Sequence, residues 1–114
     1  MEIITPEIRE DLLANGRRTA AGEEIDPFPV VKLFLPDGKA TWLVTEMTPG
    51  AEDVLYGIAD LGVGAPECGD IFLDDVLALR GPTGLGVERD TAFRPDKTLS
   101  SYATAATDAG FLRA

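Results

Sequence analysis

The sequence contains no histidine and a single cysteine, Cys68. An intramolecular disulfide needs two cysteines, and structural zinc sites are built from several Cys and His ligands. Ser-His-Asp triads and Cys-His dyads need a histidine as their base. All of these are excluded, and the sequence assigns no catalytic residue, no metal ligand and no cofactor. A magnesium or manganese site built from carboxylates alone stays open, because these hard cations take oxygen ligands.

The sequence also lacks a long hydrophobic run. Apolar residues make up 45% of its 114 residues but come in short groups, whereas a membrane-crossing helix needs about 20 in succession. Glu2 stands where a secretory signal carries positive charge, and no apolar segment follows it. We therefore expect a soluble, cytoplasmic protein with no membrane contact. A chain of this length supplies one hydrophobic core, so residues 1–114 are expected to form a single domain.

Basic residues are few, with 10 Lys and Arg against 20 Asp and Glu, which gives a formal net charge of −10. Residues 1–79 hold 5 basic and 16 acidic side chains, whereas residues 80–114 hold 5 and 4. This balance disfavours direct nucleic-acid binding, which depends on a basic face that contacts phosphates. Two explanations stay open for the acidity: solubility, or an acidic face that meets a basic partner or imitates DNA.

The first residues predict a short helix. Thr5 is a capping residue, Pro6 suits the first helical position, and Glu7 places negative charge near the helix start. Asn15-Gly16 is typical of a helix end. These signals predict a helix over residues 6–14, followed by an exposed loop over residues 17–29.

The clearest local pattern is a β-hairpin formed by residues 30–35 and 40–47 around Asp37-Gly38. In that register Leu33 faces Trp42, and one face of the hairpin is wholly apolar. The same alternation places Glu46 on the apolar face, where a carboxylate needs a partner.

The rest of the chain extends the sheet. Residues 54–61 and 68–73 are expected to be strands, Asp74 to cap a short helix, residues 85–89 to add a brief strand, and residues from Thr98 to Gly110 to form a last helix. The predicted fold is α+β: an antiparallel β-meander of about four to five strands, with a short N-terminal helix, a short helix after the fourth strand and a C-terminal helix.

Four segments resemble those of a known family. Residues 79–90 (LRGPTGLGVERD) and 93–95 (FRP), with 41–46 (TWLVTE) and 67–69 (ECG) upstream, resemble signatures of the bacterial domain-of-unknown-function family 2958. Asp70 and Phe72 depart from the family's pattern after that glycine. The resemblance implies a small protein often encoded on plasmids, phages and other mobile elements, with an accessory role such as countering host defence. It implies no activity and transfers no functional residue.

The candidate binding residues are Glu88, Arg89 and Asp90, with Arg80 and Glu46 as further members. In an extended segment Glu88 and Asp90 share one face, which suits a cation or a basic partner, and Arg89 points to the other face. Arg89 is then free to pair with Glu46 or Glu67. The alternative is a structural network of arginine and carboxylates that pins the loop to the sheet.

Other polar and reactive residues have structural interpretations. The glycine-rich residues 81–86 form a turn, because no Lys-Ser/Thr pair follows them as in a phosphate-binding loop. Asp74 and Asp75 favour a helix start over a metal site. Trp42 is expected in the core, and Cys68 is expected to be a small buried hydrophobe.

Three functions remain, and they belong to different classes. The favoured one is a non-enzymatic acidic protein-binding module, an accessory protein of a mobile element whose partner is a basic host defence or DNA-processing factor. The second is a small enzyme or ligand-binding protein with a carboxylate and arginine site, with a divalent metal as an option; it requires a pocket where Glu46, Glu88 and Asp90 converge. The third is a structural subunit or a homo-oligomer formed by pairing sheet edges.

Overall fold

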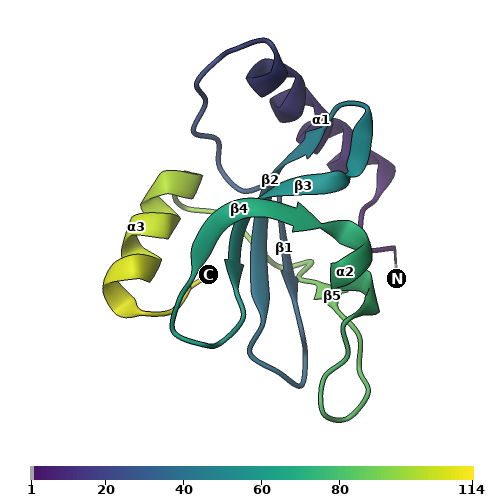
Figure 1. Cartoon of the computed structure of the whole chain (residues 1–114), viewed down its shortest axis with the longest axis vertical. Helices are drawn as coiled ribbons and strands as arrows, with labels where there is room; N and C mark the ends of the chain where they lie inside the picture. Colours follow the sequence, from purple (N-terminus) through teal and green to yellow (C-terminus); the bar gives the residue numbers. More distant parts are fainter. Residues whose placement is uncertain (1) are drawn as a thin grey trace.

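The computed structural model describes residues 2–114, which form one five-stranded antiparallel sheet and three helices (Figure 1). In chain order the elements are α1 (Pro6–Ala20), β1 (Val31–Phe34), β2 (Thr41–Thr48), β3 (Ala51–Asp60), β4 (Glu67–Phe72), α2 (Leu73–Ala78), β5 (Glu88–Arg89) and α3 (Leu99–Ala109). The order across the sheet is β4-β3-β2-β1-β5. The predicted α+β meander with its three helices is confirmed.

The hairpin forms in the predicted register. Val31 pairs with Val44 and Leu33 with Trp42. The Leu35 amide donates to the Ala40 carbonyl at 3.0 Å, which closes the loop between the two strands. The alternating apolar pattern therefore fixed both the pairing and the face that is buried.

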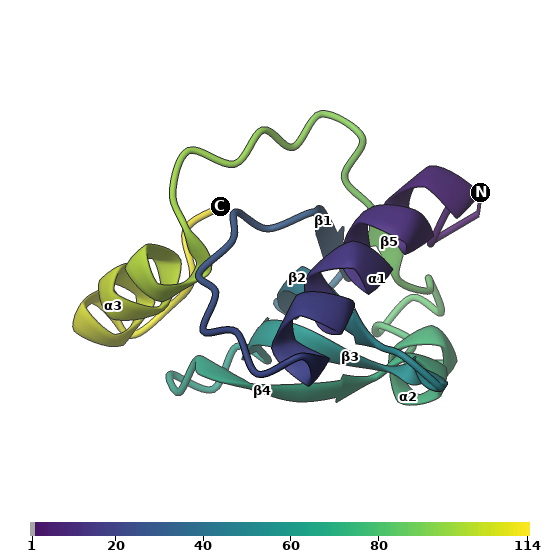
Figure 2. The same cartoon turned by 90° about the horizontal axis from the view of Figure 1, so that it is seen from above.

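The sheet carries a hydrophobic core on each face, so the expectation of a single core is wrong. Neighbouring residues of β2, Trp42 and Leu43, belong to different cores, because successive strand side chains point to opposite faces. The larger core packs under α1, and its members from the helix and the three inner strands are Leu12, Leu13, Val31, Leu33, Trp42, Val44, Met47 and Leu55. The smaller core packs under α3 and consists of Leu43, Ile58, Leu99 and Tyr102. Figure 2 shows α1 and α3 over different parts of the sheet.

Helix α1 begins as predicted but is longer. The Thr5 hydroxyl accepts a hydrogen bond from the Ile8 amide at 3.2 Å, and Pro6 is the first helical residue. The predicted end at residue 14 is wrong, because the helix continues to Ala20. Gly16 is not a stop: a Cβ atom there would lie 1.9 Å from the Met47 carbonyl oxygen. This glycine lets α1 approach β2 closely.

The other two helices differ in how they start. Asp74 was expected to cap α2, but the helix begins at Leu73 after Phe72, so Asp74 and Asp75 lie in its first turn, where they face the positive end of the helix dipole. Helix α3 begins after Thr98 and ends at Gly110, as predicted, and Gly110 has a positive φ of 81°.

Within residues 2–114 no helix combines the length and the hydrophobicity needed to cross a membrane.

We expect Gly16→Ala to lower the free energy of unfolding by about 1–3 kcal/mol, because the added methyl group pushes α1 away from β2. Urea unfolding followed by circular dichroism measures the change. Gly69→Ala is the control, since a Cβ atom at that position meets nothing within 4 Å. Equal stability of the two variants would contradict a close approach at Gly16.

Candidate functional site

A β-bulge in β2 decides which way Glu46 points. Val44 pairs with Gly57 of β3, and Glu46 pairs with the next residue, Tyr56, so Thr45 is the extra residue of the bulge. The Thr45 hydroxyl donates to the Tyr56 carbonyl at 3.3 Å and is thereby satisfied although the residue is buried. The expectation that Glu46 shares a face with Val44 is wrong, because the extra residue turns Glu46 to the face that carries α3.

On that face two adjoining hollows form what we call the acidic hollow. They share Ile25, Glu46 and Tyr56 in their walls and measure about 420 and about 330 Å³. Their carboxylates come from the loop after α1, from β2 and from β4: Glu23, Glu24, Asp26, Glu46 and Asp70. Within residues 2–114 no Lys or Arg lines either hollow. The acidic hollow therefore presents a surface of negative charge around an aromatic ring.

Tyr56 supplies that ring and is 37% exposed. Burial raises the pKa of its phenol, and the neighbouring Cys68, Glu46 and Asp70 raise the pKa further. The phenol therefore stays neutral at physiological pH. A ring of this kind, half open and surrounded by carboxylates, suits the stem and charge of a Lys or Arg side chain.

Cys68 also borders the acidic hollow. The expectation that it is buried is wrong, because β4 is the outermost strand and Cys68 is an exposed residue on it. Its neighbours still cover part of the thiol, and this burial raises the pKa, with a smaller contribution from Asp26. The group is therefore a thiol at neutral pH, whereas a nucleophilic cysteine needs a lowered pKa.

Asp26 anchors the loop that forms one wall of the acidic hollow. Its carboxylate accepts hydrogen bonds from the Ser100 amide, at 2.9 Å, and from the Ser100 hydroxyl. The Leu99 amide donates to the Pro27 carbonyl at 2.9 Å. The loop is thus tied to the first turn of α3, and the hydrogen bonds from Ser100 lower the pKa of Asp26.

The opposite face of β4 carries an apolar groove of about 250 Å³. Trp42, Ile71 and Val76 form its floor and belong to the core under α1. Leu61 and Phe72 stand at its rim and are more than half exposed. Asp70 lines both this apolar groove and the acidic hollow. The outermost strand therefore lies between an acidic surface and an apolar one.

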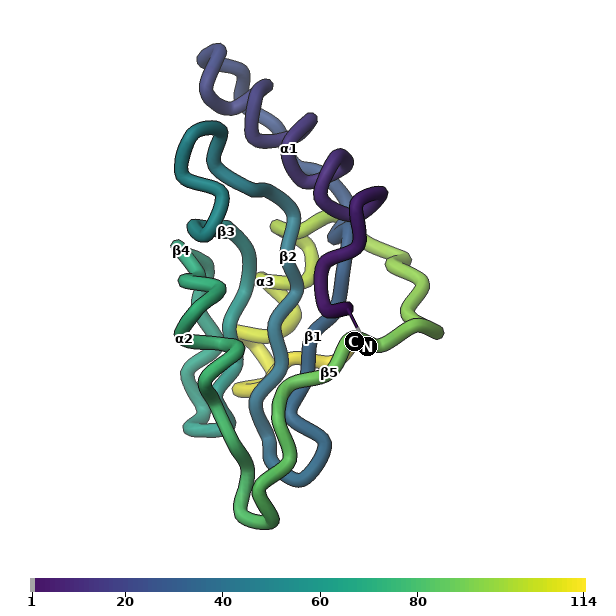
Figure 3. The backbone as a smooth tube through the Cα atoms, turned by 90° about the vertical axis from the view of Figure 1, so that its right-hand side faces the viewer, coloured from purple at the N-terminus to yellow at the C-terminus, as the bar shows by residue number. Residues whose placement is uncertain are grey.

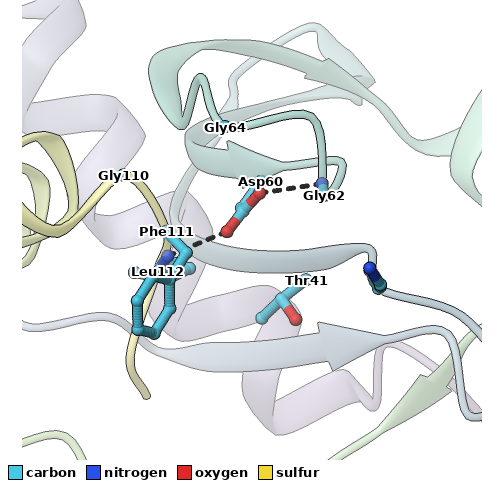
Figure 4. Close-up of a pocket in the computed structure, with 8 residues that line it drawn as sticks. Thr41, Asp60, Gly62, Gly64, Gly110, Phe111 and Leu112 are labelled. Atoms are coloured by element: carbon cyan, nitrogen blue, oxygen red, sulfur yellow. Dashed lines mark hydrogen bonds between the residues drawn. The ribbon is translucent and has the colours of Figure 1, made fainter.

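A further hollow of about 440 Å³ lies between the ends of β2 and β3 and the C-terminal segment (Figure 4). Its carboxylate, Asp60, is buried and accepts hydrogen bonds from the Gly62 and Leu112 amides, both at 2.8 Å. Because both carboxylate oxygens are occupied by main-chain donors, Asp60 fixes the C-terminal segment to the sheet.

The candidate residues Arg89 and Asp90 stabilise the fold on the other side of the sheet. Arg89 donates to the carbonyls of Glu2 and Ile3, the second at 3.0 Å, and Figure 3 shows β5 beside the start of the chain. Asp90 forms an ion pair with Lys32 at 3.4 Å. The expected pairing of Arg89 with Glu46 or Glu67 is wrong, because its guanidinium is bound to the segment before α1.

The remaining candidates lie apart from one another. Arg80 donates to the carbonyls of Leu77 and Leu79 at 2.9 and 2.8 Å. Glu88 is exposed on β5, at the opposite edge of the sheet from β4. Of the five candidates, Glu46 alone lines the acidic hollow. The structure therefore does not bring the five residues into one pocket.

Sequence reasoning missed Tyr56, Asp70 and Asp26. Two of them had a signal in the sequence: Tyr56 is an aromatic residue in mid-strand beside Gly57, and Asp26 ends an acidic run. The bulge at Thr45, which joins Glu46 to this group, leaves no signature in the sequence. Within residues 2–114 no three Cys, Asp or Glu side chains are grouped so that they could hold a metal ion.

Comparison with known proteins assigns nearly the whole chain to one family. Residues 3–113 match the family model of DUF2958, described as a protein of unknown function. The chain belongs to the DUF2958 family. This confirms the resemblance seen in the sequence. No curated protein and no solved structure matches the chain.

In this DUF2958 protein we expect Asp60→Ala to lower the free energy of unfolding by about 2–3 kcal/mol, because it leaves two main-chain amides without their charged acceptor. Asp53→Ala, at an exposed acid of the same strand, should change it by less than about 0.5 kcal/mol. Thermal and urea unfolding of both variants test this. A stable Asp60→Ala protein would show that the C-terminal segment is held by other contacts.

The lowered pKa of Asp26 predicts a pH dependence. Its carboxylate titrates below its ordinary value of 3.8 in the folded protein, so its contribution to stability is present above that value and is lost as the pH falls through the folded pKa. Asp26→Asn should therefore destabilise the protein at about pH 6, and this difference should shrink as the pH falls below 3.8. Urea unfolding at a series of pH values measures the difference in stability between the wild type and the variant. Asp11→Asn, on the exposed face of α1, is the control. A stability difference that stays constant with pH would refute this role.

Proposed function

We propose that this chain is a non-enzymatic acidic protein-binding module, and that its binding surface is the side of the molecule formed by β4 and its neighbours. The proposal rests on one observation: the same part of the chain is both strongly acidic and rich in exposed apolar side chains. The part of the chain that has acids and no bases also presents most of the exposed apolar side chains.

The acidity of this part is extreme. Residues 40–79, which form β2, β3, β4 and α2, contain eight Asp and Glu and no Lys or Arg. A surface of one sign attracts a partner of the other sign and orients it during approach. A basic protein partner is therefore the kind that this surface fits.

The same stretch also carries most of the large hydrophobic residues that are exposed within residues 2–114. Six of the nine large hydrophobic residues exposed within residues 2–114 belong to it: Tyr56, Leu61, Val63, Phe72, Leu77 and Leu79. Val63 is 78% exposed. Leu61, Phe72 and Leu79 line the apolar groove together, and exposed apolar side chains grouped beside charged ones are typical of a protein-binding surface.

The expected partner follows from this chemistry. A host defence or DNA-processing factor carries a basic surface because it binds nucleic acid, and an accessory role in a mobile element would bring this chain to such a factor. The enzyme hypothesis needs Glu46, Glu88 and Asp90 in one pocket. Since they lie apart, we do not propose it.

The test compares two triple variants that change the net charge equally. Glu46→Gln/Glu67→Gln/Asp70→Asn removes charge beside β4, and Glu7→Gln/Glu10→Gln/Asp11→Asn removes it from α1. Proteins captured from a bacterial lysate by the wild type are purified, and their affinities for the three forms are measured by calorimetry at low and high salt. The β4 variant should bind at least about tenfold more weakly, and the α1 variant should resemble the wild type at equal salt.

Equal weakening in the two variants would mean that only net charge matters. That result, or the absence of any captured protein whose binding depends on β4, would overturn the proposed function. Circular dichroism confirms that both variants are folded.

A further inference from the structure

Strand β4 is an open edge of the sheet. Within residues 2–114 its one hydrogen-bonded neighbour is β3, and no backbone hydrogen bond joins its outer side to another segment. Figure 2 shows β4 along the lower border of the molecule, with no strand or helix beyond it. Its outer amide and carbonyl groups are therefore available to an added strand. The other edge strand, β5, has only two residues.

The two faces beside this edge differ in chemistry. On the α3 side lies the acidic hollow, with Glu46, Tyr56 and Asp70. On the α1 side lies the apolar groove, with Trp42 and Ile71. A strand added to β4 points alternate side chains to these two faces. Each face thus sets the chemistry of every second residue of the added strand.

We infer that β4 binds an extended segment of the protein partner in which basic and apolar residues alternate. The basic residues enter the acidic hollow, where Glu46 and Asp70 receive their charge and the Tyr56 ring contacts their stems. The apolar residues enter the groove above Ile71. The inference rests on the proposed function and adds the mode of binding, which is strand addition.

The negative charge of β4 disfavours a second copy of this chain as the strand that pairs with its open edge. Natural edge strands are often protected by Lys, Pro or a bulge. Strand β4 has none of these, and its charged residues are Glu67 and Asp70. Two such strands paired with each other bring like charges together, which is destabilising. A basic strand meets the same carboxylates as partners.

The probe is an eight-residue peptide in which lysine and valine alternate, long enough to span the six residues of β4. The control peptide has the same composition with its lysines and valines in two blocks. Both have the same charge, so general attraction does not separate them. We expect the alternating peptide to bind at least about tenfold more tightly by calorimetry. Amide hydrogen exchange should slow at alternate residues of β4.

Backbone pairing is tested with two N-methylated forms of the alternating peptide, one methylated at every lysine and one at every valine. In an added strand only one of these sets of amides points to β4. We expect one form to lose at least about tenfold in affinity and the other to stay within about threefold of the parent.

Protein variants test the apolar groove. Phe72→Ala should weaken the alternating peptide at least about threefold, because Phe72 is 51% exposed at the rim of the groove. Phe28→Ala is the matched control, since Phe28 is 50% exposed and lies outside the groove. It should bind like the wild type. Because both rings are about half exposed, we expect both variants to stay folded.

The outcomes separate the inference from the proposed function. Equal binding of the alternating and block peptides, or of the two methylated forms, overturns strand addition while basic-protein binding stands. A wild-type dimer in sedimentation experiments that slows exchange along β4 also overturns it, because a second copy then occupies the edge. Failure of the triple-variant experiment removes the proposed function, and strand addition falls with it.

Discussion

The structure depends on the inner strand β2, which must bury side chains on both of its faces. Trp42, Val44 and Met47 pack under α1, and Leu43 packs under α3. A regular strand would place Val44 and Met47 on opposite faces, so the extra residue Thr45 is what keeps both under the helix. The Asn15 side chain donates to the Thr45 carbonyl at 2.9 Å, which binds α1 to the bulge.

The acidic hollow is a consequence of the same bulge. Once Met47 is turned toward α1, Glu46 must face the other side, where α3 covers only the region of Leu43 and Ile58. The strand positions beyond that small core, among them Tyr56, are left partly open. The Asp26 carboxylate then holds the loop after α1 against Ser100, so the loop borders this opening without closing it.

The parts of the fold predictable from sequence are those specified by local residues. Alternation around Asp37-Gly38 determines the hairpin register, and Thr5 determines the start of α1. The end of α1 was not predictable, since Gly16 serves a contact with Met47, 31 residues away in the chain. The placement of the candidate residues was not predictable for a similar reason. Arg89 was expected to pair with Glu46 or Glu67, yet Arg80 and Arg89 donate to main-chain carbonyls, which any sequence can supply.

This use of the arginines also explains why the acidity remains uncompensated at the β4 side. Arg80, Arg89 and Arg94 donate to main-chain carbonyls, and Lys97 pairs with Asp96 rather than with an acid of residues 40–79. Within residues 2–114, Glu52 is the one acid of that stretch in an ion pair, with Arg9 of α1, and Asp60 is satisfied by main-chain amides. The other six form no ion pair there, and three of them, Glu46, Glu67 and Asp70, lie on or beside the open edge strand β4. Like charge there opposes pairing with another copy of the chain, and it favours a basic strand by the same electrostatics.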